Sequence, residues 1–221
     1  MTRTALTPLL FIALGGLACK SAQNTRLIAS DPTVLVHGSE GSELGVATKY
    51  GVVFLGREAN RGRVEFTTWF GDGPSMEEGV VEAVGEELYT TSAEIRLSEV
   101  PVSFHRPDPG DRVIVRGRRS DGPWQTTTEV VADPRVEGLL LRPTPELDAL
   151  DDRQLGAGVY VIDSTGRKQL VGLISGRLRL VDPTGSRSYI TATGPGELWR
   201  LVLHRRNSDR PRRQVYREDV L

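Results

Sequence analysis

The residues of this chain that could carry out chemistry are few and widely spaced. Its histidines are His37, His105 and His204, and its single cysteine is Cys19. Nucleophilic catalysis needs a hydroxyl or thiol beside a base, and a metal site needs several converging ligands. Because no two histidines are close in the sequence, we expect no metal site. No residue is assigned a catalytic role, and no cofactor is expected.

One short stretch has the form of a nucleophile motif. Asp163-Ser164-Thr165-Gly166 resembles the pattern D-S-x-G. A type I turn with Asp and Gly at its ends explains the same four residues. We therefore interpret the stretch as a turn, and Ser164 stays only as a nucleophile for an alternative hypothesis.

Trp124 is a candidate for binding rather than for catalysis. It follows Gly122-Pro123 in a polar stretch that we predict to be a loop. Tryptophan is enriched where partners bind most strongly, although it is more often buried. An exposed Trp124 would therefore be a binding anchor.

Length and composition limit the class of protein. The chain has 221 residues, of which 38% are hydrophobic and 26% charged, and this suits one globular domain with additional segments. Its 28 basic and 29 acidic residues give a net charge of −1. This balance argues against nucleic acid as a partner and against binding to a membrane through a basic patch.

The first residues predict export from the cytoplasm. Arg3 stands near the start, and the stretch 5–18 that follows carries no charge. This is the anatomy of a secretory signal peptide, and the stretch is too short to span a membrane comfortably. We therefore assign residues 1–18 to a signal peptide.

The lone cysteine directly follows this segment. Gly16-Leu17-Ala18-Cys19 resembles the lipobox of bacterial lipoproteins, although Gly16 stands where that motif usually has leucine. The resemblance implies that Cys19 is lipidated, and that residues 19–31 tether the protein to the cell envelope. Lys20, rather than aspartate, follows the cysteine, which favours an outer membrane facing the periplasm. An ordinary signal-peptidase cut after Ala18 would instead give a secreted protein.

The body of the chain, residues 32–205, is predicted to be all-β. Apolar and β-branched runs of a few residues recur between clusters of Gly, Pro, Asp and Ser, which is typical of a sandwich or barrel. One helix is expected after residue 196, where Leu198, Leu201 and Val202 form an apolar stripe. Residues 206–221 read as a basic, polar tail.

The order of these elements resembles the trypsin/chymotrypsin-like serine proteases. Residues 156–176 are similar to the block that contains that family's nucleophile, with 170–176 (LVGLISG) as its second strand. Residues 101–104 (PVSF) and 109–115 (PGDRVIV) look like the passage between its two barrels. The resemblance implies a double β-barrel closed by a C-terminal helix.

The catalytic triad of that family is missing from the matching positions. The resemblance places Leu155 at the nucleophile, and residues 155–158 contain no Ser, Thr or Cys. Glu58 falls where the histidine belongs, and the stretch 93–97 contains no aspartate. Because hydrolysis by this chemistry needs all three groups, we predict a domain without a working triad.

The leading hypothesis is therefore a lipid-anchored envelope protein whose cleft binds an extended peptide or another envelope protein by strand addition. Leu155 and Glu58 would face that cleft. One alternative is a divergent serine-type hydrolase, which needs a hydroxyl within hydrogen-bond reach of His37 or His105. Another is a barrel that acts as a spacer while the helix or tail makes the contact.

Overall fold

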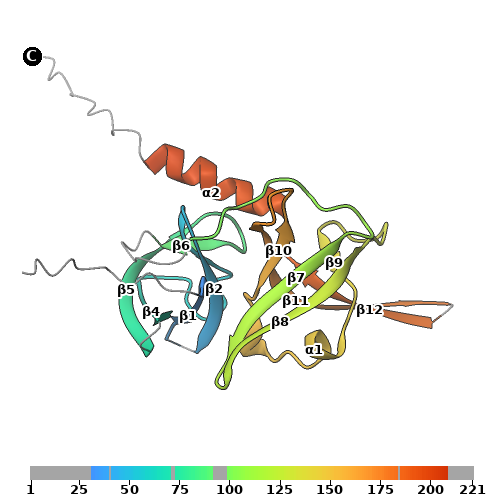
Figure 1. Ribbon diagram of the computed structural model, residues 1–221, viewed down its shortest axis with the longest axis horizontal. Coiled ribbons are helices and arrows are strands. Elements are labelled where there is room, and N and C mark those ends of the chain that lie inside the picture. Colours follow the sequence, from blue (N-terminus) through green and yellow to red (C-terminus); the bar gives the residue numbers. More distant parts are fainter. Residues whose placement is uncertain (1–30, 40, 71–72, 92–98, 184, 209–221) are drawn as a thin grey trace, which may run out of the picture.

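The computed structural model describes residues 31–39, 41–70, 73–91, 99–183 and 185–208. They form two closed six-stranded antiparallel barrels and a C-terminal helix (Figure 1). The predicted double β-barrel is therefore confirmed. The predicted signal peptide, Cys19 and residues 209–221 of the predicted tail lie outside the described residues.

The first barrel has the strand order β1-β2-β3-β6-β5-β4. Side chains that alternate along β1 and β4, such as Val34, Val36 and Phe66, are buried in its interior. Phe54 packs edge-on against Phe66, with ring centres 6.5 Å apart. The strands are β1 (Thr33–His37), β2 (Ser42–Thr48), β3 (Gly51–Phe54), β4 (Arg63–Phe70), β5 (Gly73–Ala83) and β6 (Tyr89–Thr91).

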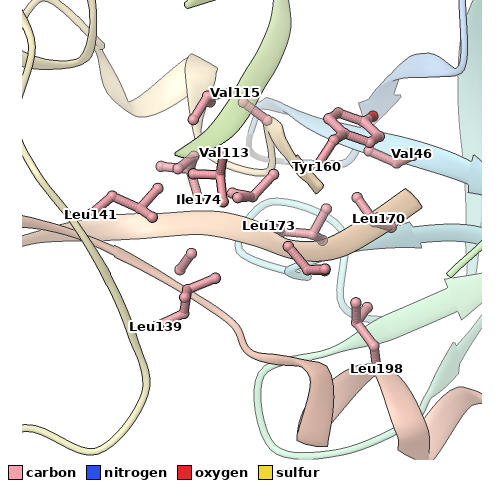
Figure 2. Close-up of a cluster of buried hydrophobic side chains, with 14 of the residues drawn as sticks. Val46, Val113, Val115, Leu139, Leu141, Tyr160, Leu170, Leu173, Ile174 and Leu198 are labelled. Atoms are coloured by element: carbon pink, nitrogen blue, oxygen red, sulfur yellow. The ribbon is translucent and has the colours of Figure 1, made fainter. Parts of the chain in front are cut away.

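The second barrel has the strand order β10-β11-β12-β9-β8-β7. Its core gathers Val113, Val115, Tyr160 and Leu173, all fully buried (Figure 2). Val46 of the first barrel joins the same cluster, so this core continues across the junction between the barrels. The strands are β7 (Arg112–Arg119), β8 (Gly122–Val131), β9 (Leu139–Leu141), β10 (Gly158–Ile162), β11 (Lys168–Asp182) and β12 (Gly185–Ala192).

Backbone hydrogen bonds join the two barrels. The Leu44 N–H in β2 donates to the Leu155 carbonyl at 3.0 Å. The passage between the barrels pairs with both: the Val100 N–H donates to Ala47, and the Leu170 N–H donates to Pro101. Residues 101–104 therefore lie between the barrels, as their resemblance to the family implied.

Gly156 lies at the tightest point of this junction. Its φ is +87°, a left-handed conformation that side chains disfavour. A Cβ atom added there would lie 1.8 Å from the Leu44 carbonyl oxygen. Only glycine therefore fits beside β2 at this position.

The helices are short apart from the last. α1 (Pro145–Asp148) and the 3-10 helix η1 (Asp152–Gln154) precede β10, and α2 (Pro195–Ser208) ends the described chain. Leu198, Leu201 and Val202 are buried, so the predicted apolar stripe is confirmed. In the described part of the chain, no helix has the length and apolar character needed to cross a membrane.

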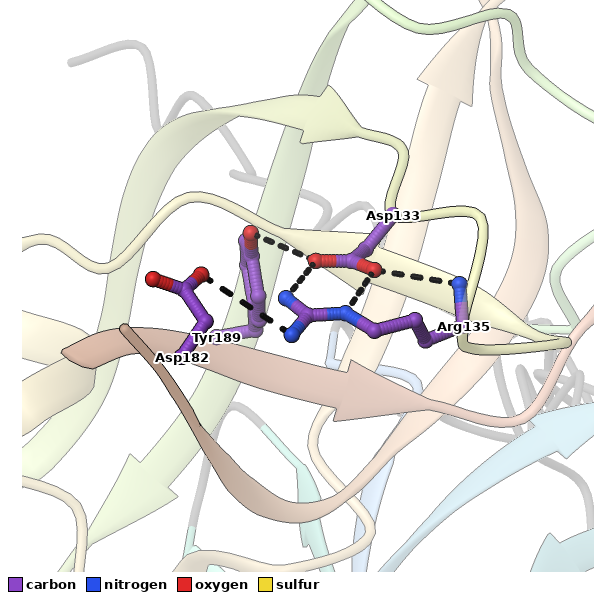
Figure 3. Close-up of polar contacts among 4 residues, drawn as sticks. All are labelled: Asp133, Arg135, Asp182 and Tyr189. Carbon is purple, nitrogen blue, oxygen red and sulfur yellow. Dashed lines mark hydrogen bonds and ion pairs between the residues drawn. The ribbon is translucent and has the colours of Figure 1, made fainter. Parts of the chain in front are cut away.

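An arginine clamp holds the loop after β8 against the β11–β12 hairpin, whose tip projects from the second barrel (Figures 1 and 3). The buried Asp133 carboxylate accepts hydrogen bonds from Arg135 Nε at 2.8 Å and Nη2 at 2.7 Å. The Tyr189 hydroxyl donates to the same carboxylate at 3.1 Å, and Arg135 Nη1 lies 3.9 Å from Asp182. The hydrogen bonds from Arg135 hold the pKa of Asp133 far below its usual range.

Candidate binding cleft

A hollow of about 600 Å³ opens beside the segment that precedes β10. We call it the main hollow. The first barrel contributes two lining residues and the second barrel the rest. They are Arg57, Glu87, Leu150, Asp151, Asp152, Leu155, Ile174, Ser175, Gly176, Arg177, Ile190 and Thr191.

Leu155 lines this hollow, as its place in the resemblance suggested. It follows η1 and is only 7% exposed. Its carbonyl accepts the Leu44 N–H, and the next N–H, from Gly156, donates to Ile174 at 2.8 Å. The residue is thus fixed from both barrels, and its side chain has no atom that can act as a nucleophile.

The residue of the β3–β4 loop that lines the main hollow is Arg57, not Glu58. Arg57 Nη1 donates to the Ser175 carbonyl at 2.9 Å, reaching from the first barrel to the second. The Glu58 carboxylate lies instead over Gly41, where an added Cβ would be 2.7 Å from Glu58 Oε2. Glu58 was expected to face the cleft, but the residue of this loop that lines the main hollow is Arg57, one position earlier.

A buried carboxylate, which the sequence analysis did not single out, supports this loop. Glu43 is 1% exposed, and its Oε1 accepts the Glu58 N–H at 3.1 Å. Its Oε2 is buried without a hydrogen-bond partner among the described residues. Burial raises the pKa of Glu43, and backbone hydrogen bonds from the loop oppose that rise only in part.

Arg177 shapes the opposite wall of the main hollow. Its Nη2 donates to the carbonyls of Leu147, Asp148 and Leu150, which close α1 and the turn after it. Nη2 carries two hydrogens, so at least one of them is shared between two carbonyls. The wall that carries Asp151 and Asp152 is therefore held in place by β11.

Trp124 lies in strand β8 and not in the predicted loop, because residues 122–131 pair with β7. It lies outside the main hollow and is half-buried. Its Nε1 donates to Gln154 Oε1 at 2.6 Å, and its ring covers Gly117, where a Cβ would come within 2.6 Å. The Arg119 guanidinium lies 5.3 Å from the ring centre. Trp124 thus supports the residue before Leu155 instead of standing free as an anchor.

The histidines lie away from the main hollow. His37 Nδ1 is 2.8 Å from Ser42 Oγ, and His37 Nε2 is 2.7 Å from Thr67 Oγ1. His105 is exposed in a loop, and His204 pairs with Glu82 at 2.7 Å. No cluster of His, Cys, Asp or Glu able to hold a metal occurs among the described residues.

Two predicted positions remain, Ser164 and the stretch 93–97. Ser164 is exposed in a turn in which Asp163 Oδ1 accepts hydrogen bonds from the N–H groups of Thr165 and Arg167. This agrees with the interpretation of the stretch as a turn. The stretch 93–97, where the aspartate of a triad was sought, lies outside the described residues.

The structures of two serine proteases and of one peptidase are similar to this fold. A serine endoprotease from Yersinia pestis aligns with a TM-score of 0.53 and 18% identity, over 82% of this chain and 64% of its own. A human astrovirus serine protease aligns with a TM-score of 0.52 and 15% identity, over 75% and 91%. Kallikrein-related peptidase 10 has the same score and identity, over 81% and 98%.

These likenesses define the fold. At the sequence level, no protein-family model and no curated protein matches the chain. The chain has the fold of the trypsin-like serine proteases, as its sequence resemblance implied.

The buried Glu43 predicts a pH dependence of stability. The pKa of Glu43 is higher in the folded protein than its ordinary value of 4.5. As pH rises above 4.5, the unfolded chain therefore loses this proton before the folded protein does. The folded protein then binds more protons, so the free energy of unfolding falls as pH rises from 4.5 toward the raised value. Compared with Glu43→Gln, the wild type should lose at most about 1.4 kcal/mol per pH unit in this range.

Urea unfolding of the two proteins from about pH 4 to about pH 7 measures this difference. Glu78→Gln, at an exposed position on β5, is the matched control: because it keeps Glu43, its free energy of unfolding should follow that of the wild type across this pH range. A constant difference between wild type and Glu43→Gln across this range would contradict the prediction.

Proposed function

We propose that this chain is a lipid-anchored protein of the bacterial cell envelope, whose trypsin-like domain binds an extended peptide and does not hydrolyse it. The observation that carries the proposal is the content of the main hollow. Leu155 lines it with a hydrocarbon side chain, Arg57 extends into it, and all three histidines lie elsewhere.

The polar groups of the hollow support binding over catalysis. Ser175 Oγ donates to Thr191 Oγ1 at 3.1 Å, with no histidine among the lining residues to activate it. A serine nucleophile needs such a base within hydrogen-bond reach. Arg57 and Arg177 are both engaged with backbone carbonyls.

The edge of β11 supports strand addition. β10 pairs with β11 only as far as Leu173, and beyond that point β11 pairs with β12 alone among the described strands. The backbone from Ser175 onward therefore has one edge without a strand partner, and an extended peptide can pair with such an edge. Arg57 occupies the Ser175 carbonyl on this edge, so an incoming peptide N–H would replace it.

Gly176 offers a direct test of peptide binding. A Cβ at Gly176 would meet only Thr191 Oγ1, at an ordinary 3.5 Å, so Gly176→Phe can fill the hollow without backbone strain. We expect decapeptides enriched by the wild-type protein from a displayed random library to bind Gly176→Phe at least about tenfold more weakly, because several contacts are lost. Fluorescence polarisation with the enriched peptides measures the change.

The control for this test is Gly196→Phe, at an exposed site in α2 with nothing within 4 Å of an added Cβ. This variant should bind as the wild type does. If no peptide is enriched, or if the Gly176 and Gly196 variants bind equally well, peptide binding in the main hollow is wrong.

The lipid anchor has its own test. Two or three acyl chains on Cys19 would hold the protein stably on a membrane, and Cys19→Ala removes their attachment point. We expect the wild type to partition into the detergent phase of Triton X-114 and to carry a diacylglyceryl mass on Cys19. The alanine variant should move to the aqueous phase. A wild-type protein that begins at an unmodified Cys19 would instead support secretion.

The hydrolase alternative is favoured by one observation, the contact between His37 and Ser42. In that case Ser42 would attack the phosphorus of a fluorophosphonate probe, its proton would pass to His37, and fluoride would leave. We expect no adduct on the intact protein, because the second ring nitrogen of His37 contacts the Thr67 hydroxyl, where a working triad has a carboxylate that orients the ring. Intact mass spectrometry after incubation with the probe measures this.

An adduct that is lost in both Ser42→Ala and His37→Gln would replace the binding proposal with this alternative. Trypsin treated in parallel shows that the probe is active. Ser164→Ala is the matched serine control, because Ser164 lies in an exposed turn away from any histidine contact.

A further inference from the structure

A second hollow, of about 440 Å³, is lined in part by Arg153 and Gln154, which directly precede Leu155 in the chain. We call it the arginine hollow. Leu35, Leu44 and Trp69 of the first barrel form an apolar wall, and Arg118, Arg119 and Arg153 of the second barrel lie opposite. No lining residue is shared with the main hollow.

The charge of the arginine hollow is one-sided. Three arginines line it, and none of its lining residues is acidic. Arg118 Nη1 lies 3.3 Å from the buried carboxylate of Asp31, so its charge is partly compensated. Neither Arg119 nor Arg153 forms a salt bridge with a described residue.

Two of the guanidinium groups are held in place by tryptophans. Arg118 lies over the ring of Trp69, 4.1 Å from its centre, and Arg119 lies 5.3 Å from the ring centre of Trp124. Trp124 is in turn fixed by its hydrogen bond to Gln154. A stacked guanidinium loses less freedom when it binds, and its planar fork matches a carboxylate.

We propose that the arginine hollow binds an acidic side chain, flanked by an apolar residue, of the extended peptide that occupies the main hollow. The guanidinium groups would receive the carboxylate, and the wall of Leu35, Leu44 and Trp69 would receive the apolar neighbour. The two hollows draw on one short segment, because Arg153 lines one while Asp151 and Asp152 line the other, so we place the peptide along this segment. The inference rests on the proposed function, because it takes the ligand to be a peptide that occupies the main hollow.

The test uses the full chain and a fluorescein-labelled hexapeptide that carries one glutamate beside one leucine and is otherwise uncharged. We expect the dissociation constant to rise about tenfold or more in Arg119→Gln/Arg153→Gln, since charge-assisted hydrogen bonds are lost. The same peptide with glutamine in place of glutamate should bind the wild type equally weakly. Arg119→Lys/Arg153→Lys, which keeps the charge but not the fork, should fall between.

The control, Arg179→Gln/Arg187→Gln, removes the same charge from the β11–β12 hairpin and should bind as the wild type does. If this control weakens binding as much as Arg119→Gln/Arg153→Gln does, the effect is one of net charge and the inference is wrong. The inference is also wrong if inorganic phosphate binds the wild type more tightly than the peptide does, because the site would then select a free oxyanion.

Gly176→Phe separates this inference from the proposed function. If it abolishes binding of the acidic peptide while Arg119→Gln/Arg153→Gln does not, peptide binding stands and the acidic specificity is overturned. If only the arginine double variant abolishes binding, the arginine hollow binds an acidic side chain without help from the main hollow, and the proposal of one peptide in both hollows is overturned. Loss in both variants is the result expected of a peptide that crosses Leu155.

Discussion

The close backbone contact between β2 and the segment before β10 determines the geometry of everything around Leu155. The Leu44 N–H donates to Leu155, and the Leu44 carbonyl lies so close to Gly156 that no Cβ fits between them. The positive φ of Gly156 turns the chain back into β10 at this point. Because the contact fixes both barrels on one segment, it also positions residues 151–155, which contribute to the lining of both hollows.

Around this contact, polar side chains satisfy the backbone instead of presenting themselves to a reacting group. Arg57 is bound to the Ser175 carbonyl, Arg177 to carbonyls after α1, and Glu43 to the Glu58 N–H. Catalytic stabilisation needs donors aimed at atoms where charge develops. Donors already committed to the backbone stabilise the walls of the main hollow, which suits a site that holds a ligand unchanged.

The sequence was sufficient for the local features of the fold. Alternation of apolar residues located most strands, and Leu198, Leu201 and Val202 defined the buried face of α2. The three-residue β6 was missed, because a strand so short carries little pattern and depends on its neighbours β3 and β5. Leu155 was located only because residues 156–176 resemble a known block, since a leucine by itself signals no site.

The rest of the site depends on contacts between distant parts of the chain. Glu58 and Arg57 are adjacent in a loop, and it is Arg57 that enters the hollow. What distinguishes Arg57 is its hydrogen bond to the Ser175 carbonyl, 118 positions further along the chain. The three hydroxyl and imidazole groups at His37 come from β1, β2 and β4, and the arginine hollow draws on both barrels. No spacing rule predicts such convergence, because strand pairing and barrel packing create it.

The two hollows differ in charge, and this has a consequence for any peptide that crosses Leu155. Glu87, Asp151 and Asp152 line the main hollow together with Arg57 and Arg177, so its acidic residues outnumber its basic ones by one, whereas the only charged residues of the other hollow are three arginines. A peptide with one acidic and one basic end would meet complementary charge in one direction and like charge in the other. Like charges a few ångströms apart near a protein surface cost several kcal/mol, on the order of 4 at an effective dielectric constant of about 20. The charge pattern would therefore fix the direction of the bound chain, a choice that an unpaired strand edge alone leaves open.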